Sequence, residues 1–508
     1  MIRATALMLG LLLAAALPHP ERSSASSFQH VVVIVIDGAR PDYLDLTPMP
    51  NLRRLMRDGT VYTRAWVGQM IANTPPVHAT LATGTLPRTN GVIGFGWKDP
   101  SSGRMTWPTS MEAVMRGEQQ RVLAASGVPT IAGILRARLP RLVAASVSSS
   151  KYFAADAMGL EANYVVFRTR PSRGTSQPSA VPGREPHPGV LNAPSLRDPR
   201  NPSDAWATDA ALALFRAVRP QVLLLNLPAT DEQGHATGGI VAPEIMSRIV
   251  QIADVQIGRL LRAYEDAGVL AQTLWVVTSD HGMVPSERLV DVAQLRKAAA
   301  EAGARLMGGG GSSAEFWVDD PGKTEAAARA IAGIGLPGVS AVYRKVREGS
   351  GFAYLPVEVG LPVPGDLDAA YRYLFSTFAG AHGPEIAVPF RENTIGVGDQ
   401  PTDPTLPFRY RGSHGGVSWL IQHIPLVISG PGVRRGAVTD HPARVVDIAP
   451  TIAALLGAVP TGMDGIVLGD AFDVPPIGSL ELQEAQARRL RPLQDALIAA
   501  SRRDRAGR

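Results

Sequence analysis

The feature that most constrains the fold is a continuous run of apolar, mostly β-branched residues that stops abruptly at a polar turn. The run extends from His30 to Ile36 and is followed at once by Asp37 and Gly38. A strand that is apolar on both faces is typical of a parallel sheet covered by helices on each side. Three other segments have the same shape, at residues 222–227, 274–277 and 425–428. The sequence therefore predicts a buried sheet.

Helical patterns lie between these apolar runs, most clearly at residues 204–218 and 243–267. Strands that alternate with helices predict an α/β fold with a doubly wound, mostly parallel central sheet flanked by helices. In such sheets ligands gather beyond the carboxyl ends of the strands. Three of the runs deliver an aspartate to that edge: Asp37, Asp231 and Asp280.

The first 27 residues have the pattern of a secretory signal peptide. Arg3 supplies a positive charge, the apolar segment 4–17 is too short to span a bilayer, and small residues suited to cleavage lie near Ala16 and Ala25. An uncleaved membrane anchor is the alternative. Either interpretation places the protein outside the cytoplasm, periplasmic or secreted, and cleavage would leave no transmembrane span. The chain has no cysteine, which excludes disulfides, a thiol nucleophile and cysteine-type zinc sites.

The net charge of +5 is concentrated at the C-terminus, where seven arginines and two aspartates follow Ala487 in the basic segment beginning at Arg488. Residues 476–508 are predicted to form a basic C-terminal helix and tail. We interpret its charge as a solvated surface, with contact to an anionic lipid or polymer as the alternative. No pattern of a nucleic-acid-binding module is present in the sequence.

The chain of 508 residues is long enough for one large core and a smaller lobe. We assign a catalytic domain to residues 28–283 and 412–475, and an inserted α+β cap lobe to residues 284–411. The insertion is expected to contain strands near 315–318 and 339–343 and a helix near 324–334. Two stretches are expected to be loops: the proline-rich residues 168–202 and Gly308–Gly311, which lacks the Gly-Lys-Ser/Thr of a phosphate-binding loop.

Six acids and histidines lie where strands or loops end. They are Asp37, Asp231, His235, Asp280, His281 and His414. Such a set of oxygen and nitrogen donors suits a pair of divalent ions, which in phosphoryl chemistry lie roughly 3.5–4 Å apart. Asp231 and His235 are four residues apart, which places them on one face of a helical turn. Each residue alone is weak evidence, and their joint order carries the prediction.

Thr74 is the candidate nucleophile. It precedes two prolines and a helix-like run. A threonine hydroxyl reacts poorly unless a metal or a base lowers its pKa, and an alkoxide at a helix N-terminus beside a metal ion would be stabilised twice. The structural interpretation is that Thr74 caps the helix, and capping and catalysis are compatible.

Together these motifs resemble the alkaline phosphatase superfamily, and within it most closely the type I phosphodiesterase and nucleotide pyrophosphatase family. Five motifs occur in the order of the family, and a segment at 445–451 is similar to one near the superfamily's C-terminus. The five are Val-Ile-Asp-Gly at 35–38, Thr-Pro-Pro-Val-His at 74–78 leading to Thr-Gly-Thr-Leu-Pro at 83–87, Asp-Glu-Gln-Gly-His at 231–235, Ser-Asp-His-Gly at 279–282 and Gly-Ser-His-Gly at 412–415.

The resemblance implies two zinc ions per chain. Asp231, His235 and His414 would hold one, and Asp37, Asp280 and His281 would hold the other, beside Thr74. His382 competes with His414, which we prefer because Gly-Gly and then a strand follow it as in the family. Thr74 would attack phosphorus and form a phosphothreonine that is then hydrolysed. The expected substrate is a small phosphorylated molecule: a phosphodiester, a pyrophosphate or a phosphomonoester.

The chain departs from the family's pyrophosphatases at the positions that contact substrate. Their asparagine downstream of the nucleophile falls near Phe95 here, Asn90 is out of register, and their Trp-Pro-Gly segment is not found. Lys151 follows three serines, similar to the substrate-binding lysine of threonine-type phosphatases and phosphonoacetate hydrolases. Asn90 and Lys151 are the candidate substrate-binding residues. A lysine there favours a dianionic phosphate or phosphonate over a diester, and a surface lysine is the alternative.

Other functions stay open at this point. A phosphonate hydrolase, a phosphoryl transferase or a mutase of the same superfamily would use the same residues. A binding protein on a decayed enzyme scaffold is the non-enzyme alternative, although all six ligands and the nucleophile are present. A sulfatase is excluded because Thr74 occupies the position of its required cysteine or serine. The protein is expected to be a monomer or a homodimer.

Overall fold

The four apolar runs lie in one nine-stranded sheet. The computed structural model describes residues 29–169, 176–181, 183–184, 186–359, 362–398, 411–458 and 461–506, so the predicted signal peptide lies outside the described residues. The strand order is β20-β2-β19-β9-β1-β8-β5-β6-β7. The strands are β1 (His30–Ile36), β2 (Gly59–Tyr62), β5 (Ala144–Val147), β6 (Tyr164–Thr169), β7 (Gln177–Ser179), β8 (Val222–Leu227), β9 (Thr273–Thr278), β19 (Leu426–Ser429) and β20 (Ala437–Thr439).

The sheet is mostly parallel, which confirms the predicted fold class. Strands β9, β1, β8, β5 and β6 run in one direction, whereas β19 is antiparallel to both β9 and β2. Leu426, at the start of β19, pairs with Thr278, at the end of β9. The chain that precedes β19 therefore arrives at the edge where the central parallel strands end.

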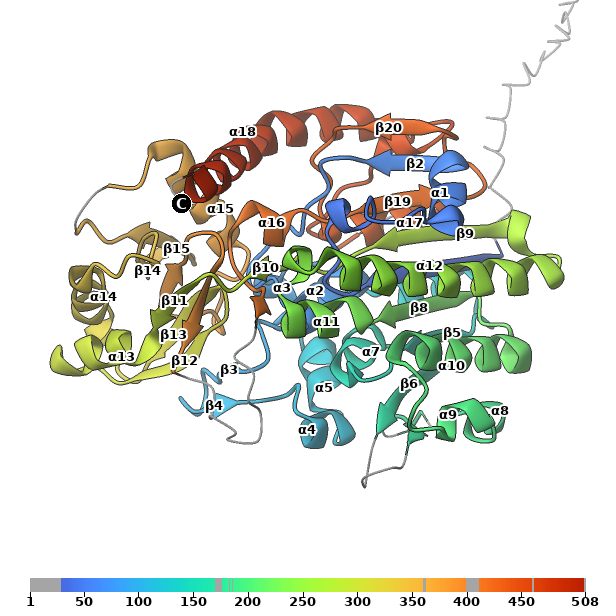
Figure 1. The fold of residues 1–508 in the computed structure, drawn as a ribbon, viewed down its shortest axis with the longest axis horizontal. Coiled ribbons are helices and arrows are strands. Elements are labelled where there is room, and N and C mark those ends of the chain that lie inside the picture. The colour runs from blue at the N-terminus through green and yellow to red at the C-terminus, as the bar shows by residue number, and fades with distance from the viewer. Residues whose placement is uncertain are drawn as a thin grey trace, which may run out of the picture.

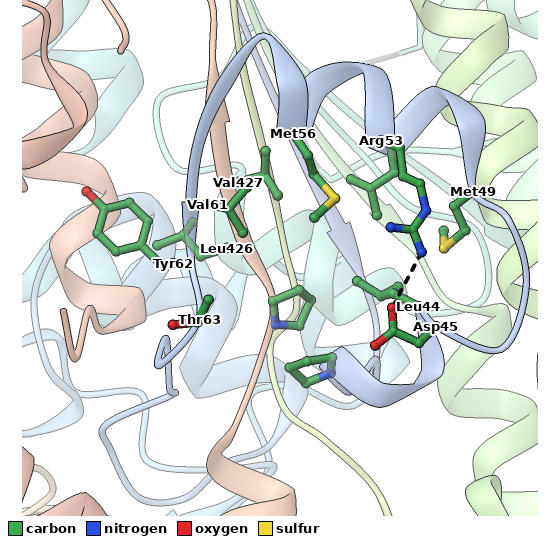
Figure 2. A pocket seen from close by; sticks show the side chains of 13 residues that line it. Leu44, Asp45, Met49, Arg53, Met56, Val61, Tyr62, Thr63, Leu426 and Val427 are labelled. Atoms are coloured by element: carbon green, nitrogen blue, oxygen red, sulfur yellow. Dashed lines mark hydrogen bonds and ion pairs between the residues drawn. The ribbon is translucent and has the colours of Figure 1, made fainter. Parts of the chain in front are cut away.

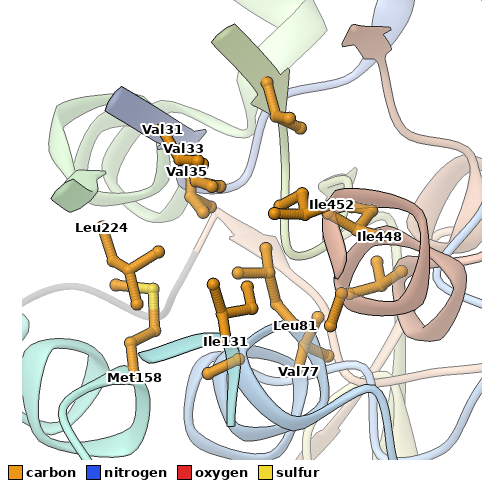
Figure 3. Close-up of a cluster of buried hydrophobic side chains, with 14 of the residues drawn as sticks. Val31, Val33, Val35, Val77, Leu81, Ile131, Met158, Leu224, Ile448 and Ile452 are labelled. Atoms are coloured by element: carbon orange, nitrogen blue, oxygen red, sulfur yellow. The ribbon is translucent and has the colours of Figure 1, made fainter. Parts of the chain in front are cut away.

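Helices cover both faces of this sheet because alternate residues of a strand point to opposite sides. Val31, Val33 and Val35 pack with α2 (Thr74–Thr83), α6 (Ile131–Arg138), α7 (Tyr152–Met158) and α17 (Ile448–Leu455) (Figure 3). The alternate residues Val32, Ile34 and Ile36 pack with α1 (Pro50–Arg57), α10 (Ser203–Val218) and α12 (Pro243–Asp266). The buried sheet thus fixes the positions of its strand ends.

The inserted segment forms a second sheet of five strands, in the order β12-β13-β16-β14-β15, beside the first (Figure 1). Its strands are β12 (Leu306–Gly310), β13 (Ser313–Val318), β14 (Tyr343–Glu348), β15 (Gly351–Pro356) and β16 (Ile386–Pro389). Helices α13 (Val292–Glu301), α14 (Thr324–Ile334) and α15 (Gly365–Ser376) contact it. The predicted helix at 324–334 and strand near 315–318 are confirmed.

Three local predictions are wrong. Gly308–Gly310 form part of β12 and not a loop. Glycines do not favour a strand by themselves, but backbone pairing with β13 stabilises one here. The strand expected at 339–343 begins only at Tyr343, and Val339 makes an isolated bridge with Phe390. The described part of the stretch 168–202 is not only loop, since it contains the end of β6, β7, α8 (Pro188–Leu191) and α9 (Pro194–Arg197).

The predicted C-terminal helix is present as α18 (Ser479–Ala506), which contains Pro492. Along its middle, Asp495 pairs with Arg64 at 2.5 Å. Near its end, Asp504 Oδ2 accepts a hydrogen bond from the backbone N–H of Glu392 at 2.9 Å. The helix therefore contacts both the main sheet region and the inserted segment, as its course across the top of Figure 1 shows.

The remaining helices and strands are short. They are α3 (Pro87–Asn90), α4 (Met111–Met115), α5 (Glu118–Ala125), α11 (Ala229–Thr237), α16 (Trp419–Gln422), β3 (Trp97–Lys98), β4 (Met105–Thr106), β10 (Val284–Pro285), β11 (Arg288–Asp291), β17 (Thr394–Val397) and β18 (Gly412–Ser413). Within the described residues, no helix has both the length and the apolar character that a bilayer span requires.

An apolar pocket of about 230 Å³ opens between α1 and the strands β2 and β19 (Figure 2). Met49, Met56 and Leu426 line it, and an ion pair between Arg53 and Asp45 lies at its side. None of the six predicted metal ligands lines this pocket.

Candidate metal centre

The predicted metal ligands come from the ends of neighbouring elements. Asp37 follows β1, Asp231 and His235 lie on α11 after β8, Asp280 and His281 follow β9, and His414 follows β18. Strands β9, β1 and β8 are adjacent and parallel, so their carboxyl ends lie at one edge. All six side chains are buried except that of His235, which is 22% exposed.

The first predicted ligand set is brought together. Asp231 Oδ1 lies 3.4 Å from His235 Nε2 and 3.3 Å from His414 Nε2. The two Nε2 atoms are 3.1 Å apart. One carboxylate oxygen and two imidazole nitrogens therefore face a common point.

The second predicted set is adjacent to the first. His281 Nε2 lies 3.7 Å from Asp37 Oδ1, 3.3 Å from Asp280 Oδ2 and 3.9 Å from Asp231 Oδ1. Its ring stacks on that of His414, with centroids 3.6 Å apart. His281 thus lies between the two sets. It forms a compact group with Asp231 and His414, whereas the histidine that forms a compact group with Asp37 and Asp280 is His78.

Several of these donor atoms are buried and have no hydrogen-bond partner. They are Asp37 Oδ1, Asp231 Oδ1, Asp280 Oδ2 and His281 Nε2. A buried polar atom without a partner costs free energy, and three carboxylates in one buried site repel one another. Bound divalent cations would give these atoms a partner and would offset the repulsion between the carboxylates. Aspartate oxygens with histidine nitrogens form a donor set suited to zinc. The residues therefore fit a metal centre.

The histidines are oriented as metal ligands require. The Nδ1 atom of His235 lies 2.9 Å from the carbonyl oxygen of Gly412, and that of His281 lies 3.1 Å from the carbonyl oxygen of Gly282. A carbonyl only accepts, so the proton is on Nδ1 and the Nε2 lone pair is available. Burial lowers the pKa of His235 to about 4 and that of His281 to about 3, which keeps both rings neutral.

Thr74 is the first residue of α2, and Asn73 is the N-cap, so the structural interpretation of Thr74 as the cap is wrong. The Thr74 hydroxyl is buried and has no hydrogen-bond partner. Pro75 and Pro76 suit the first turn of a helix but have no N–H, which leaves the backbone N–H of Thr74 as the free donor there. One turn later, His78 Nδ1 bonds the carbonyl oxygen of Thr74 at 2.8 Å.

Lys151 lies in the site, not on the surface. Its ammonium pairs with Asp231 Oδ2, and its side chain is 14% exposed. Burial alone would lower the pKa of Lys151, but the charges of Asp231 and Asp37 raise it above its ordinary value. The lysine therefore stays charged beside the carboxylates.

Asn90 has a different environment. Its side-chain amide donates to the carbonyl oxygen of Thr85 at 2.8 Å and accepts from the backbone N–H of Val92 at 2.9 Å. The residue is fully buried. Because both polar groups hold its own turn, Asn90 has no part in the site proposed below. His382, the competitor of His414, bonds the carbonyl oxygen of Gly91 at 3.1 Å instead.

Asn226 is a functional candidate that the sequence analysis missed. Its Nδ2 donates to Asp37 Oδ2 at 3.0 Å and to Ser148 Oγ at 3.2 Å, and its Oδ1 lies 3.2 Å from His78 Nε2. The only signal in the sequence is that an asparagine interrupts the apolar run of β8. His78 itself lies 3.6 Å from Asp280 Oδ2 and groups with Asp37 and Asp280.

A comparison with protein families bears directly on this arrangement. The model of the type I phosphodiesterase / nucleotide pyrophosphatase family matches residues 31–355, which is more than half of the chain. The chain belongs to this family. The match begins at β1 and includes five of the six candidate ligands, and His414 lies beyond its end.

Curated relatives of this family member match parts of their own length only. An uncharacterised pyrophosphatase/phosphodiesterase of Schizosaccharomyces pombe is 26% identical over 256 residues, 50% of this chain and 45% of the relative. A bis(5'-adenosyl)-triphosphatase of Xenopus laevis is 34% identical over 73 residues, 14% of this chain and 16% of the relative. The chain thus matches less than half the length of either.

Solved structures share the fold over most of the chain. Human ectonucleotide pyrophosphatase/phosphodiesterase 5 has a TM-score of 0.61 at 18% identity, covering 88% of this chain and 100% of that one. The alkaline phosphatase PafA has a TM-score of 0.65 at 15% identity, covering 87% and 99%. At these identities the two structures show that the fold is shared.

Proposed function

We propose that this protein hydrolyses phosphoric esters with two zinc ions and with Thr74 as the nucleophile. The observation that carries the proposal is the cluster of six donor residues at one sheet edge. Four of their donor atoms, three oxygens and one nitrogen, are buried without a hydrogen-bond partner. Thr74 supplies a buried hydroxyl at the start of α2, whose His78 contacts Asp280. The family membership supports the same chemistry.

The proposed reaction has two displacements at phosphorus. Bound zinc would supply positive charge that offsets charge on the reacting oxygens and lowers the pKa of the Thr74 hydroxyl. Thr74 Oγ1 forms a bond to phosphorus while the bond to the leaving oxygen breaks, and the hydroxyl proton leaves with the alcohol. Water then attacks the phosphothreonine, the Thr74–phosphorus bond breaks, and the threonine regains a proton.

The residues around Thr74 have defined tasks in this reaction. Lys151, charged and held at Asp231, would bind a phosphate oxygen and orient the substrate. The backbone N–H of Thr74 offers a further donor at the helix N-terminus. Asn226 holds Asp37 through one oxygen and leaves the other for metal.

Two aromatic side chains beside Lys151 favour a substrate with an apolar group next to the phosphorus. The Phe153 ring centroid lies 5.7 Å from Lys151 Nζ. The Phe95 ring packs edge-on against the Phe153 ring, with the two centroids 5.2 Å apart. Both rings are partly exposed. An aromatic pair contributes about 0.5–1.5 kcal/mol beyond its buried area. Because Asp231 already offsets the charge of Lys151, the expected preference of this lysine for a dianionic phosphate is reduced, and the rings favour larger substrates. We therefore propose phosphodiesters or pyrophosphates that carry an aromatic group, rather than small monoesters, as substrates.

We further propose that the protein works outside the cytoplasm, on the basis of the leader pattern in residues 1–27, and that residues 284–411 act as a cap lobe. The lobe is linked to the site, because the backbone N–H of Ser312 donates to the carbonyl oxygen of His414 at 3.0 Å.

The function is tested by comparing the zinc-loaded protein on p-nitrophenyl phosphate, bis-p-nitrophenyl phosphate and p-nitrophenyl phenylphosphonate. The last two should give the higher kcat/KM. Thr74→Ala should lower the preferred activity by at least about 1000-fold while zinc content is unchanged.

Thr80→Ala is the matched control, because Thr80 is also buried on α2 with an unpartnered hydroxyl. It should keep most of the activity. Retention of most of the rate by Thr74→Ala would rule out Thr74 as the nucleophile, and a strong preference for the monoester would contradict the proposed substrate class.

A further inference from the structure

Asn73 precedes the proposed nucleophile and does not act as its residue type suggests. It is the N-cap of α2, and asparagine is among the best N-cap residues, stabilising a helix by about 1 kcal/mol through a side-chain bond to the first turn. Its side chain makes no such bond, because the two residues that would donate, Pro75 and Pro76, have no N–H. The side chain of Asn73 is therefore available for another partner.

The side chain of Asn73 contacts His414 instead. Asn73 Oδ1 lies 2.9 Å from His414 Nδ1, and the carbonyl oxygen of Ala72 lies 3.3 Å from the same nitrogen. Ala72 also forms an antiparallel bridge with Gly415, so the two segments are joined by their backbones. The close approach needs a glycine: a Cβ on Gly415, whose φ is +93°, would lie 2.6 Å from Asn73 Oδ1.

These contacts decide which nitrogen of His414 is free. Both groups that face Nδ1 are acceptors, so the proton is on Nδ1 and the lone pair is on Nε2. Nε2 faces Asp231 Oδ1 at 3.3 Å and His235 Nε2 at 3.1 Å. The orientation of the His414 ring also bears on His281, which stacks on it.

We propose that Asn73 is a positioning residue that fixes the tautomer and ring orientation of His414 for metal binding. The inference rests on the proposed zinc-dependent function. The role links the nucleophile to the metal set of Asp231, His235 and His414, which Thr74 does not belong to. Asn73 would hold the ligand His414, and the next residue, Thr74, would attack phosphorus.

The test measures zinc affinity by competition with a chromophoric chelator, on full-length protein. Asn73→Leu has a similar size but cannot accept a hydrogen bond, and it should weaken one of the two zinc sites by about 10–100-fold while sparing the other. Asn73→Asp keeps the acceptor and should bind both ions nearly as tightly as the wild type. This rescue separates positioning from packing.

Asn90→Leu is the matched control. It removes another fully buried asparagine whose side chain holds a turn. It should lower the unfolding midpoint of the metal-free protein and leave the zinc affinity of the folded protein unchanged. Circular dichroism of each metal-free variant confirms that it is folded.

If the wild type binds two zinc ions and Asn73→Leu binds both with unchanged affinity, the role of Asn73 is overturned and the proposed function is left intact. Equal loss of affinity in Asn73→Leu and Asn73→Asp would also overturn it, because the acceptor would not matter. A wild type that binds no zinc would remove the inference together with the proposed function.

Discussion

At the scale of single residues, buried acids in this protein are accommodated in two ways. Those of the candidate metal centre face other ligands, whereas Glu315 on β13 lies in the inserted segment beside Ser313. The Ser313 hydroxyl has one proton but faces both Glu315 Oε1 at 2.6 Å and the carbonyl oxygen of Gly415 at 3.1 Å. A protonated Glu315 satisfies both, since it donates to Ser313, which then donates to Gly415.

Burial raises the pKa of Glu315 to about 8, in agreement with this hydrogen-bond pattern. In the unfolded chain a glutamate has a pKa of about 4.3. The folded protein therefore holds one more proton than the unfolded chain between these values, and its stability falls as the pH rises through this window, by up to about 1.4 kcal/mol per pH unit.

Glu315→Gln should remove this pH dependence, because glutamine donates to Ser313 without titrating. The melting temperature of the variant relative to the wild type should increase as the pH rises from about 5 to about 8 and then level off. Thermal unfolding of both proteins across this range measures it. A constant difference at all pH values would show that Glu315 is not protonated in the folded state.

The sequence motifs predicted the residues that lie together in the candidate metal centre, but not the residues that contact them from outside. Asp37, Asp231 and Asp280 were predictable because each follows an apolar run, and the ends of parallel strands meet. Asn73 and Asn226 were not, because their roles depend on side chains far along the chain, His414 and Asp37. Asn90 was proposed from its position in sequence, which does not show that its amide is used within its own turn.

At the scale of elements, β1, β8, β9 and β19 of the main sheet were predictable because they are apolar on both faces. The inserted strands β12 and β14 were not. Glycines give no strand signal in β12, and β14 has the partly exposed sequence Tyr-Arg-Lys-Val-Arg-Glu. Each is held by pairing with neighbours: β12 with β13, and β14 with β15 and β16. Such pairing is a property of the folded sheet, not of the segment.

Helix α18 offers a test of how an element is held. Leu497 is 1% exposed in a cluster with Leu374 and Phe375 of α15, whereas Leu482 on the same helix is 61% exposed. Leu497→Ala should lower the free energy of unfolding by about 2–5 kcal/mol, and Leu482→Ala should change it by less than about 0.5 kcal/mol. Denaturant titrations compare the two. Equal effects would mean that the contact between α18 and α15 does not stabilise the fold.

At the scale of the whole molecule, the site depends on three regions. The central strands deliver the aspartates, α2 delivers Thr74, and the segment leading into the antiparallel strand β19 delivers His414. The inserted sheet supports that segment, through the bond from Ser312 to His414 and the bond from Ser313 to Gly415. The family's motifs lie far apart in the sequence and meet because of this topology.

The most direct test of the central claim is a crystal structure of the active protein, with diffraction measured on both sides of the zinc absorption edge. The account predicts two zinc ions, roughly 3.5–4 Å apart, bound by Asp37, Asp231, His235, Asp280, His281 and His414 beside Thr74. Crystals of active protein with no zinc among these six side chains, or with zinc bound only elsewhere, would contradict it.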